Sequence, residues 1–133
     1  MVIGASTGNY LPDDVEEAQS VFRNAGHDVR EYFYFGESIL LPEWRGQGIG
    51  KRFFAERERA ARNLLQVKYL TFCCVDRSAT HPIGPESYRS PKPLWLSQGF
   101  VEHPELVARF SWRDLGATKE TAKPMIFWIK SLF

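Results

Sequence analysis

A run of seven residues near the middle of the chain has the types and spacing of a phosphate-binding loop. Three glycines on alternate positions stand between two cationic residues, in the order Arg45, Gly46, Gln47, Gly48, Ile49, Gly50 and Lys51. Glycines lack Cβ atoms, so a diphosphate can come close to their backbone, and a helix start presents N–H groups without partners in the helix. The partial positive charge of a helix start also favours an anion. We therefore predict a diphosphate site here.

Two common phosphate-binding patterns do not fit this loop. The P-loop pattern G-x-x-x-x-G-K-[ST] requires glycine at the position of Arg45 and serine or threonine at the position of Arg52. The dinucleotide pattern G-x-G-x-x-G requires a third glycine where the chain has Lys51 or Phe53. Both spacings therefore argue against a nucleotide-binding protein, and the pattern that remains is Arg45-x-x-Gly48-x-Gly50.

This remaining pattern resembles the Q/R-x-x-G-x-G/A signature with which the GNAT family of N-acetyltransferases binds the pyrophosphate of acetyl-coenzyme A. The resemblance also includes the preceding strand, which ends at Leu41-Pro42, and the Gly99-Phe100 pair, so it covers roughly residues 33 to 112. It implies an α/β (α+β) fold with a mixed, mostly antiparallel, twisted sheet around a central βαβ unit. It also implies transfer of an acetyl group from acetyl-CoA to a primary amine of a small molecule or protein.

In that family the central strand and its parallel neighbour splay apart, and main chain at the gap binds the pantetheine arm of the coenzyme. Carried over to this chain, the resemblance gives that role to Ser38, Ile39, Leu40 and Leu41, beside the cradle of residues 45–51. The simpler interpretation of Ile39 and Leu41 is core packing, which is compatible with a backbone contact. The general rule that α/β ligands bind beyond the carboxyl ends of strands agrees with this placement.

Acetyl transfer to an amine needs a base or a water relay and a proton donor for the departing thiolate. Glu37 is the candidate base, because the neighbouring Phe35 and Tyr34 would desolvate its carboxylate; the alternative is an edge or salt-bridged glutamate. The family's acid is a tyrosine four residues before the Gly-Phe pair, where this chain has Trp95. Tyr88 is the substitute that we predict, although a tyrosine in a proline-rich loop more often packs its ring.

Other reactive side chains are weaker candidates. His81 fits a surface histidine better than a base, and the three histidines and two cysteines lack zinc spacing, so no metal is predicted. Cys73 and Cys74 lie in an apolar run, where burial raises the pKa of a thiol and disfavours a nucleophile. Adjacent strand residues are also poorly placed to pair with each other, which suggests a reducing compartment.

Hydrophobic periodicity predicts the elements that position these residues. A strand over residues 2–5 runs into a Ser-Thr-Gly-Asn turn, and a helix capped by Asp13 or Asp14 stops at Gly26. The longest strand covers residues 31–41, with a bulge or close backbone approach at Gly36. Further expected elements are a helix over 48–65, a strand over 69–75, a loop over 76–93, a short helix over 94–98, and strands over 106–112 and 125–132.

The helix over 48–65 and its flanking strands form a βαβ unit, so those strands should be parallel. The apolar stripe of this helix is predicted to contain Ile49, Phe53, Phe54, Ala60, Ala61, Leu64 and Leu65. Its basic residues, which include Arg57, alternate with glutamates and predict a solvated face with support from pairs such as Glu58 and Arg62. Pro124 is expected at the entrance of the last strand, where a missing N–H is tolerated.

Length and composition limit the remaining possibilities. The 133 residues, 44% hydrophobic, fit one domain over 1–133, and 17 Lys plus Arg against 16 Asp plus Glu give no strong field. We therefore expect neither a nucleic acid nor a membrane as partner. A cytoplasmic location is the default, because no signal peptide or membrane-spanning run is evident.

Compared with the family, the chain is N-terminally short, because it lacks the usual first strand and the helices that help to form the acceptor pocket. A truncated product, a partner chain that completes the sheet, and a module that binds coenzyme A without catalysis all fit this difference. We expect a homodimer, because a strand edge at residues 2–5 would expose unpaired backbone groups. A monomer in which the following segment covers that edge is the alternative.

Overall fold

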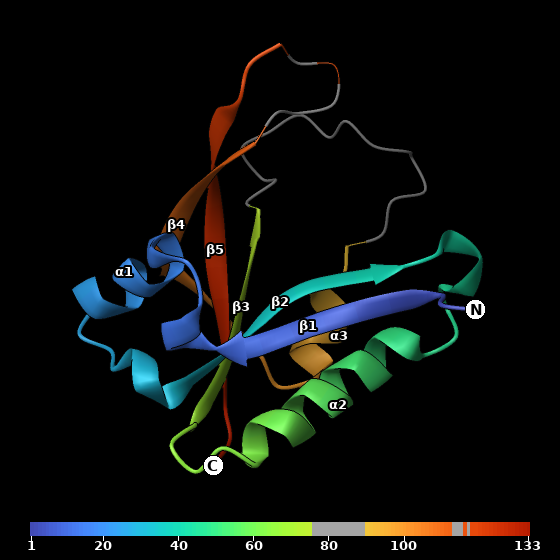
Figure 1. Cartoon of the computed structure of the whole chain (residues 1–133), viewed down its shortest axis with the longest axis horizontal. Coiled ribbons are helices and arrows are strands. Elements are labelled where there is room, and N and C mark those ends of the chain that lie inside the picture. The colour runs from blue at the N-terminus through green and yellow to red at the C-terminus, as the bar shows by residue number, and fades with distance from the viewer. Residues whose placement is uncertain (76–89, 113–115, 117) are drawn as a thin grey trace.

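The computed structural model describes residues 1–75, 90–112, 116 and 118–133 (Figure 1). The strands in these ranges are β1 (Gly4–Tyr10), β2 (Tyr32–Leu40), β3 (Tyr69–Val75), β4 (Val101–Trp112) and β5 (Thr121–Ser131). The α-helices are α1 (Glu16–Asn24), α2 (Ile49–Arg62) and α3 (Lys92–Ser97), and short 3-10 helices cover Leu11–Asp13, Val29–Glu31 and Pro42–Trp44.

The five strands form one sheet in the order β1-β2-β3-β5-β4. Strands β2 and β3 are parallel and are connected through α2, whereas the other three neighbouring pairs are antiparallel. The predicted mixed, mostly antiparallel sheet with a central βαβ unit is therefore confirmed.

Each face of the sheet has its own apolar core, which explains why β2 consists of consecutive aromatic residues rather than an apolar–polar alternation. Phe33 and Phe35 belong to the core that includes residues of α2, whereas Tyr32 and Tyr34 pack in the core that includes residues of α1. Phe72, Phe100 and Trp128 complete the aromatic part of the first core, and Leu106, Phe127 and Ile129 lie in the second. Side chains of β2 therefore point alternately to α1 and to α2.

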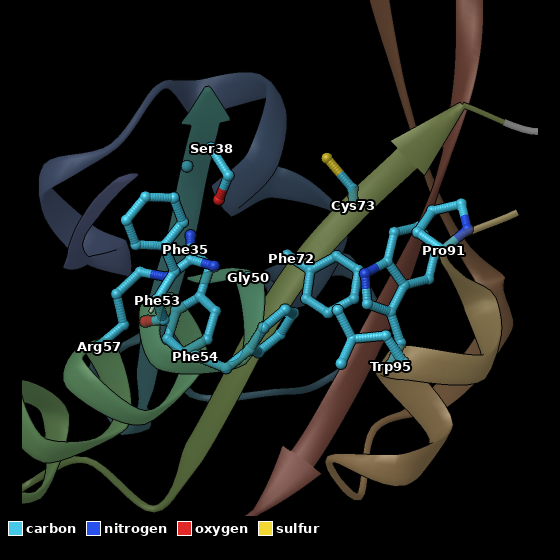
Figure 2. A pocket seen from close by; sticks show the side chains of 12 residues that line it. Phe35, Ser38, Gly50, Phe53, Phe54, Arg57, Phe72, Cys73, Pro91 and Trp95 are labelled. Atoms are coloured by element: carbon cyan, nitrogen blue, oxygen red, sulfur yellow. Dashed lines mark hydrogen bonds between the residues drawn. The ribbon is translucent and has the colours of Figure 1, made fainter. Parts of the chain in front are cut away.

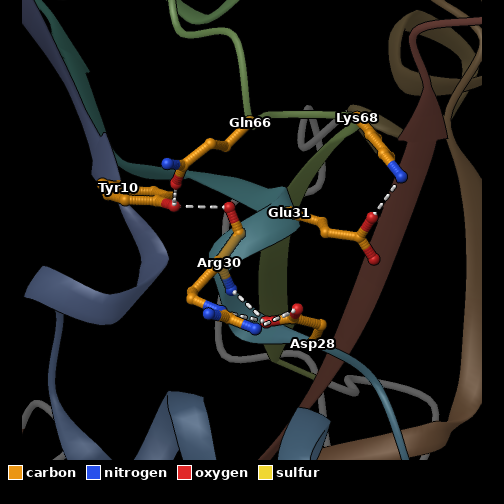
Figure 3. A network of polar contacts seen from close by, with 6 residues as sticks. All are labelled: Tyr10, Asp28, Arg30, Glu31, Gln66 and Lys68. Carbon is orange, nitrogen blue, oxygen red and sulfur yellow. Dashed lines mark hydrogen bonds and ion pairs between the residues drawn. The ribbon is translucent and has the colours of Figure 1, made fainter.

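Polar contacts connect the chain segments at the end of the sheet where β2 and β3 begin (Figure 3). The hydroxyl of Tyr10 lies 2.6 Å from the carbonyl oxygen of Arg30 and 2.5 Å from Oε1 of Gln66. The ammonium of Lys68 lies 2.7 Å from the carboxylate of Glu31. These contacts join the segment before β2 to the segment before β3, so the two strands begin side by side.

A β-bulge interrupts β2 at Gly36, as predicted. Ser6 pairs with Ser38 and Gly8 with Phe35, so Thr7 of β1 lies opposite both Gly36 and Glu37. The hydroxyl of Thr7 accepts a hydrogen bond from the Glu37 N–H at 2.9 Å. A Cβ at Gly36 would lie 2.6 Å from that hydroxyl oxygen, which explains the glycine. The extra residue reverses the alternation of side chains along the rest of β2.

Several predicted boundaries at the N-terminal end are wrong. The Ser-Thr-Gly-Asn segment continues β1 up to Tyr10, because pairing with β2 outweighs its local preference for a turn. Helix α1 begins at Glu16 after Val15, which has no side-chain cap, rather than after a capping aspartate. The carboxylate of Asp14 instead accepts a hydrogen bond from the Val15 N–H.

Helix α2 is shorter than the apolar pattern indicated. It ends at Arg62, so Leu64 and Leu65 lie beyond it and are exposed, as is Ala60. Its buried residues are Phe54, Arg57 and Ala61, which follow one another at helical spacing. Arg57 therefore lies on the core side of α2, and its assignment to a solvated face is wrong. The predicted ion pair between Glu58 and Arg62 is present at 3.3 Å.

The C-terminal elements all begin earlier than predicted: α3 at Lys92, β4 at Val101 and β5 at Thr121. Pro124 lies inside β5 rather than at its entrance. It pairs with Arg109 of β4, whereas the pairing of β5 with β3 involves Met125 and later residues. The ring of Pro124 is tolerated because, among the described residues, β5 pairs on one side only at that position.

Candidate functional site

The two parallel strands of the βαβ unit separate before they end. Their pairing stops at Tyr34 and Thr71, although β2 continues to Leu40 and β3 to Val75. Figure 1 shows β2 and β3 diverging from this point. The separation opens one edge of β2 beyond Tyr34, because β1 occupies only the other edge. We call this separation the gap.

A cavity of about 300 Å³ lies in the gap, and its walls come from four elements (Figure 2). Phe35, Gly36 and Ser38 of β2 face Phe72 and Cys73 of β3 across it. The remaining walls are Gly50, Phe53, Phe54 and Arg57 of α2, together with Pro91, Leu94 and Trp95. An outer cavity of about 640 Å³ shares four of these residues and adds Ile39, Leu40 and Arg45. The two adjoining cavities connect the glycine loop with the inner end of the gap.

The glycine loop has backbone angles that require its glycines. Gly46 and Gly48 have φ of 78° and 82°, in the left-handed region that side chains disfavour. A Cβ at either position would meet nothing within 4 Å, so the space in front of the loop is open. Helix α2 begins directly after Gly48, without a side-chain cap and without an acidic residue in its first turn. This helix end can therefore accept an anionic group on its backbone N–H donors.

Both cations of the predicted cradle lie at this helix start. Nε of Arg45 donates a hydrogen bond of 3.2 Å to the carbonyl oxygen of Leu40, the last residue of β2. Lys51 is exposed in the first turn of α2. Nε2 of Gln47 lies 3.5 Å from the carbonyl oxygen of Glu43, and this contact stabilises the loop. The structure thus brings residues 45–51 to the same end of the gap as the predicted pantetheine edge.

Residues 38–40 form the end of β2 that faces the outer cavity, and Leu41 follows directly after the strand. Ser38 lines both cavities, and Ile39 and Leu40 line the outer one. Ile39 is 63% exposed and Leu41 38% exposed, so core packing does not explain either side chain. Gly4 pairs with Leu40 and Ala5 with Ile39 on the β1 side, which holds this segment extended.

Glu37 stands at the bulge, immediately before Ser38. Its N–H is fixed by the Thr7 hydroxyl, and its side chain is exposed. The prediction that Phe35 desolvates the Glu37 carboxylate is therefore not met in the free chain. Glu37 itself lines neither cavity, although Gly36 and Ser38 on either side of it line the inner one.

Tyr88, the predicted proton donor, and His81 both lie outside the described residues. Trp95 lines the inner cavity, with its ring 4.8 Å from Phe72 and 5.1 Å from Trp128 between centroids. It thus forms an apolar wall and has no titratable proton to donate.

Arg57 is a cavity residue that the sequence analysis missed. It is 8% exposed, and its guanidinium carbon lies 4.2 Å from the ring centroid of Phe35 and 5.1 Å from that of Phe54. Nη1 donates to the carbonyl oxygen of Thr7 and Nε to that of Phe53, both at 3.3 Å. Burial lowers the pKa of Arg57 to about 10. Its position three residues after Phe54 on the buried stripe was the available signal.

A second unpredicted contact crosses the inner end of the gap. The hydroxyl of Tyr34 lies 3.3 Å from Sγ of Cys73. Burial raises the pKa of Tyr34, and it raises the pKa of the Cys73 thiol to about 11. The raised pKa of the Cys73 thiol agrees with the prediction that Cys73 is not a nucleophile. Cys73 and Cys74 form no disulfide.

In the described part of the chain, no helix has the length and hydropathy needed to cross a bilayer. No three His, Cys, Asp or Glu side chains in these ranges gather closely enough to share a metal ion.

Comparison with solved structures identifies the fold. The chain is similar to ribosomal-protein-alanine N-acetyltransferase from Brucella melitensis (TM-score 0.57, 19% identity, 99% of this chain and 63% of that one). It is also similar to a GNAT family acetyltransferase from Elizabethkingia anophelis with acetyl-CoA bound (TM-score 0.57, 18% identity, 99% and 70%). A third is the yncA protein from Salmonella typhimurium with its cofactor acetyl-CoA (TM-score 0.59, 14% identity, 100% and 60%). No family model and no curated protein matches the sequence.

These similarities show that the chain has the fold of GNAT acetyltransferases, which confirms the resemblance first suggested by the glycine spacing. The chain spans between 60% and 70% of the length of these three solved proteins. Because the sequence identities are below 20%, the comparison supports the fold and does not identify a substrate.

Proposed function

We propose that the chain is an N-acetyltransferase that transfers the acetyl group of acetyl-CoA to a primary amine of a small molecule or a protein. The observation that supports this most is the gap between β2 and β3 with the glycine loop at its outer end. Five of the eleven residues for which the sequence predicted coenzyme contacts line the cavities there, namely Ser38, Ile39, Leu40, Arg45 and Gly50.

The proposed coenzyme site has three parts, each formed by different residues of the chain. Backbone N–H groups at the start of α2, with Arg45 and Lys51, bind the pyrophosphate. The open edge of β2 over residues 38–40, together with Leu41 after the strand, hydrogen-bonds the pantetheine arm, as an extended peptide would bind a free strand edge. The aromatic walls of the inner cavity, Phe35, Phe72 and Trp95, enclose the thioester end.

The carboxylate of Glu37 is the proposed base. It takes a proton from the acceptor amine, directly or through water, so that the nitrogen lone pair is free to attack the acetyl carbonyl carbon. The new C–N bond forms and the C–S bond breaks, with the electron pair leaving on sulfur. The bulge holds Glu37 one residue before Ser38, the first residue of the proposed coenzyme edge, which supports the assignment of the base to this stretch of β2.

A module that binds coenzyme A without catalysis is the second candidate. It is favoured by Trp95, which offers no proton at the position where the family has its acid, and by the exposure of Glu37. Both candidates predict binding of acetyl-CoA, so only turnover separates them.

The experiment that tests the proposal measures coenzyme A release from acetyl-CoA across a panel of small primary amines and peptides with free N-termini or lysines. Mass spectrometry of the acceptor identifies the acetylated nitrogen. The proposal predicts stoichiometric release and acetylation with at least one amine. Binding of acetyl-CoA without turnover for any amine would favour the non-catalytic module, and no binding would reject both.

A further inference from the structure

The wall of the inner cavity contains a buried cation. Arg57 is 8% exposed, whereas the other arginines in the described part of the chain are all exposed. Figure 2 shows its side chain extending from α2 toward β2, and Arg57 lines the cavity together with Phe35 and Ser38 of that strand. A guanidinium therefore borders the space in which the proposed thioester lies.

Within the described residues, no carboxylate forms an ion pair with this cation. The two glutamates of α2 pair with other residues, Glu56 with Arg59 at 3.2 Å and Glu58 with Lys130 at 2.6 Å. Burial is the cause that lowers the pKa of Arg57 to about 10, and no neighbouring carboxylate opposes it. A buried charge is costly unless it is paired, so binding of an anion at this guanidinium is favourable.

The contacts of Arg57 use only part of its hydrogen-bonding capacity. Nε donates to the carbonyl oxygen of Phe53 and Nη1 to that of Thr7, whereas Nη2 has no hydrogen bond to a described residue. A guanidinium carries five N–H donors in a planar fork that fits a carboxylate. The rings of Phe35 and Phe54 lie against the guanidinium, so its remaining N–H groups are the part that a ligand can reach.

Arg57 lies at the end of the inner cavity that is far from the glycine loop. Gly50, in the first turn of α2, lines both cavities, whereas Arg57 lines the inner one only. The seven residues from Gly50 to Arg57 correspond to about 10 Å along the helix. When the pyrophosphate of an acyl-CoA is bound at the loop, its acyl group is at the opposite end of the molecule. The acyl group is therefore the part that extends toward Arg57.

The proposed base and Arg57 lie on different faces of β2. Neighbouring side chains of a strand point to opposite faces. Ser38 lines the cavity on the α2 side, and Glu37 lines neither cavity. An amine that gives its proton to Glu37 thus approaches from the other face, away from Arg57. An anionic group that meets Arg57 then belongs to the acyl donor rather than to the amine.

We propose that Arg57 selects the acyl donor, and that the site prefers a short acyl-CoA with a terminal carboxylate over the neutral acyl-CoA of the same chain length. The inference rests on the proposed function. The remaining N–H groups of Arg57 bind the carboxylate. The C–N bond of the amide forms, and the C–S bond breaks with its electron pair on sulfur. The proton that the amine loses to Glu37 reaches the thiolate through solvent, and the amide keeps the free carboxylate.

The test compares matched acyl donors with amines from the same panel. Succinyl-CoA and butyryl-CoA share a four-carbon chain and differ in the terminal carboxylate, and malonyl-CoA with propionyl-CoA, and glutaryl-CoA with valeryl-CoA, are the shorter and longer pairs. Coenzyme A release, corrected for the reaction without protein, gives kcat/KM for each donor. We expect at least one carboxylated donor to exceed its neutral partner by about 10-fold or more, because hydrogen bonds to charged groups contribute that factor.

Arg57→Met tests the residue, because it removes the charge and keeps a long side chain beneath Phe35. The ratio of kcat/KM between the carboxylated and the neutral donor should fall by about 10-fold or more. A merely structural role would lower both rates together and leave the ratio unchanged. Arg59→Met, exposed on the same helix, is the matched control and should keep the wild-type ratio. Arg57→Lys keeps a cation without the fork, should give an intermediate ratio, and supplies the measurement if Arg57→Met does not fold.

The outcomes separate this inference from the proposed function. If wild-type protein uses acetyl-CoA and prefers no carboxylated donor, the inference is overturned and the proposed function stands. A preference that the folded Arg57 variants retain in full overturns the assignment to Arg57. A preference for glycine over glycinamide as acceptor, lost in folded Arg57→Met, would put the carboxylate on the amine and also overturn the inference. Turnover with no acyl-CoA overturns both proposals.

Discussion

The guanidinium of Arg57 donates a hydrogen bond of 3.3 Å to the carbonyl oxygen of Thr7 and so connects the middle of helix α2 to the β1 side of the bulge. The hydroxyl of Thr7 accepts the N–H of Glu37. The bulge removes these two backbone groups from the regular ladder, and both are satisfied by this pair of contacts. The position of the proposed base therefore depends on a buried arginine of α2.

Arg57→Ala should lower the free energy of unfolding by about 2 to 4 kcal/mol. The substitution leaves the Thr7 carbonyl without its buried partner and opens space beneath Phe35 and Phe54. Urea unfolding followed by tryptophan fluorescence measures the change. Arg59→Ala is the matched control two residues along α2, where the exposed pair with Glu56 should contribute less than about 1 kcal/mol. Equal stability of the two variants would contradict this role for Arg57.

Glu37→Gln should lower kcat by about 10²-fold while the Kd for acetyl-CoA stays within a factor of about two, because the carboxylate acts on the acceptor amine. Steady-state rates with a single amine, and calorimetry with acetyl-CoA, give the two values. Glu56→Gln, on the outer side of α2, is the control. An unchanged rate in Glu37→Gln would leave water as the base.

Tyr88→Phe tests the proton donor that the sequence predicted. If Tyr88 protonates the departing thiolate, kcat should fall by roughly 10²-fold or more while the Kd for acetyl-CoA stays unchanged, because loss of a general acid removes a factor of that size. Steady-state rates with a single amine, and calorimetry with acetyl-CoA, give the two values. An unchanged kcat in Tyr88→Phe would reject the assignment.

The homodimer also stays a prediction. Strand β1 lies at one edge of the sheet, so its outer backbone groups have no neighbouring strand in the described chain. Light scattering at micromolar concentration should give about twice the chain mass of 15.3 kDa. Ala5→Lys, which places a charge on the exposed edge, should shift the mass toward the monomer, and a monomeric wild-type protein would contradict the prediction.

The parts of the site that could be predicted from the sequence are those with a local signal. Gly46 and Gly48 have a backbone geometry that requires glycine and lie just before a helix start, and Gly50 lies in the first turn of that helix, where the spacing indicated. Strand β3 over Tyr69–Val75 also has its predicted bounds, because a continuous apolar run fits a strand buried on both faces.

The parts that could not be predicted depend on contacts between distant segments. Thr7 and Arg57 meet across 50 residues, and Tyr34 and Cys73 across 39. Arg57 was assigned to the solvated face because that interpretation gave its charge more weight than its place in the helical repeat. A long cationic side chain can nevertheless lie buried between aromatic rings. The length of β1 followed from pairing with β2, which no pattern within residues 4–10 specifies.

Calorimetric titration of acetyl-CoA into Gly48→Val tests the central claim most directly, namely that the β2–β3 gap and its glycine loop form a coenzyme site. A valine at φ of 82° strains the backbone and fills the space in front of the α2 N-terminus. Gly26→Val is the control, because Gly26 has φ of 86° and open surroundings, far along the chain from the loop. We predict that Kd rises by about 10-fold or more for folded Gly48→Val and stays at the wild-type value for Gly26→Val, since losing close approach to the diphosphate removes about 1.4 kcal/mol or more. An unchanged Kd in folded Gly48→Val would contradict the account.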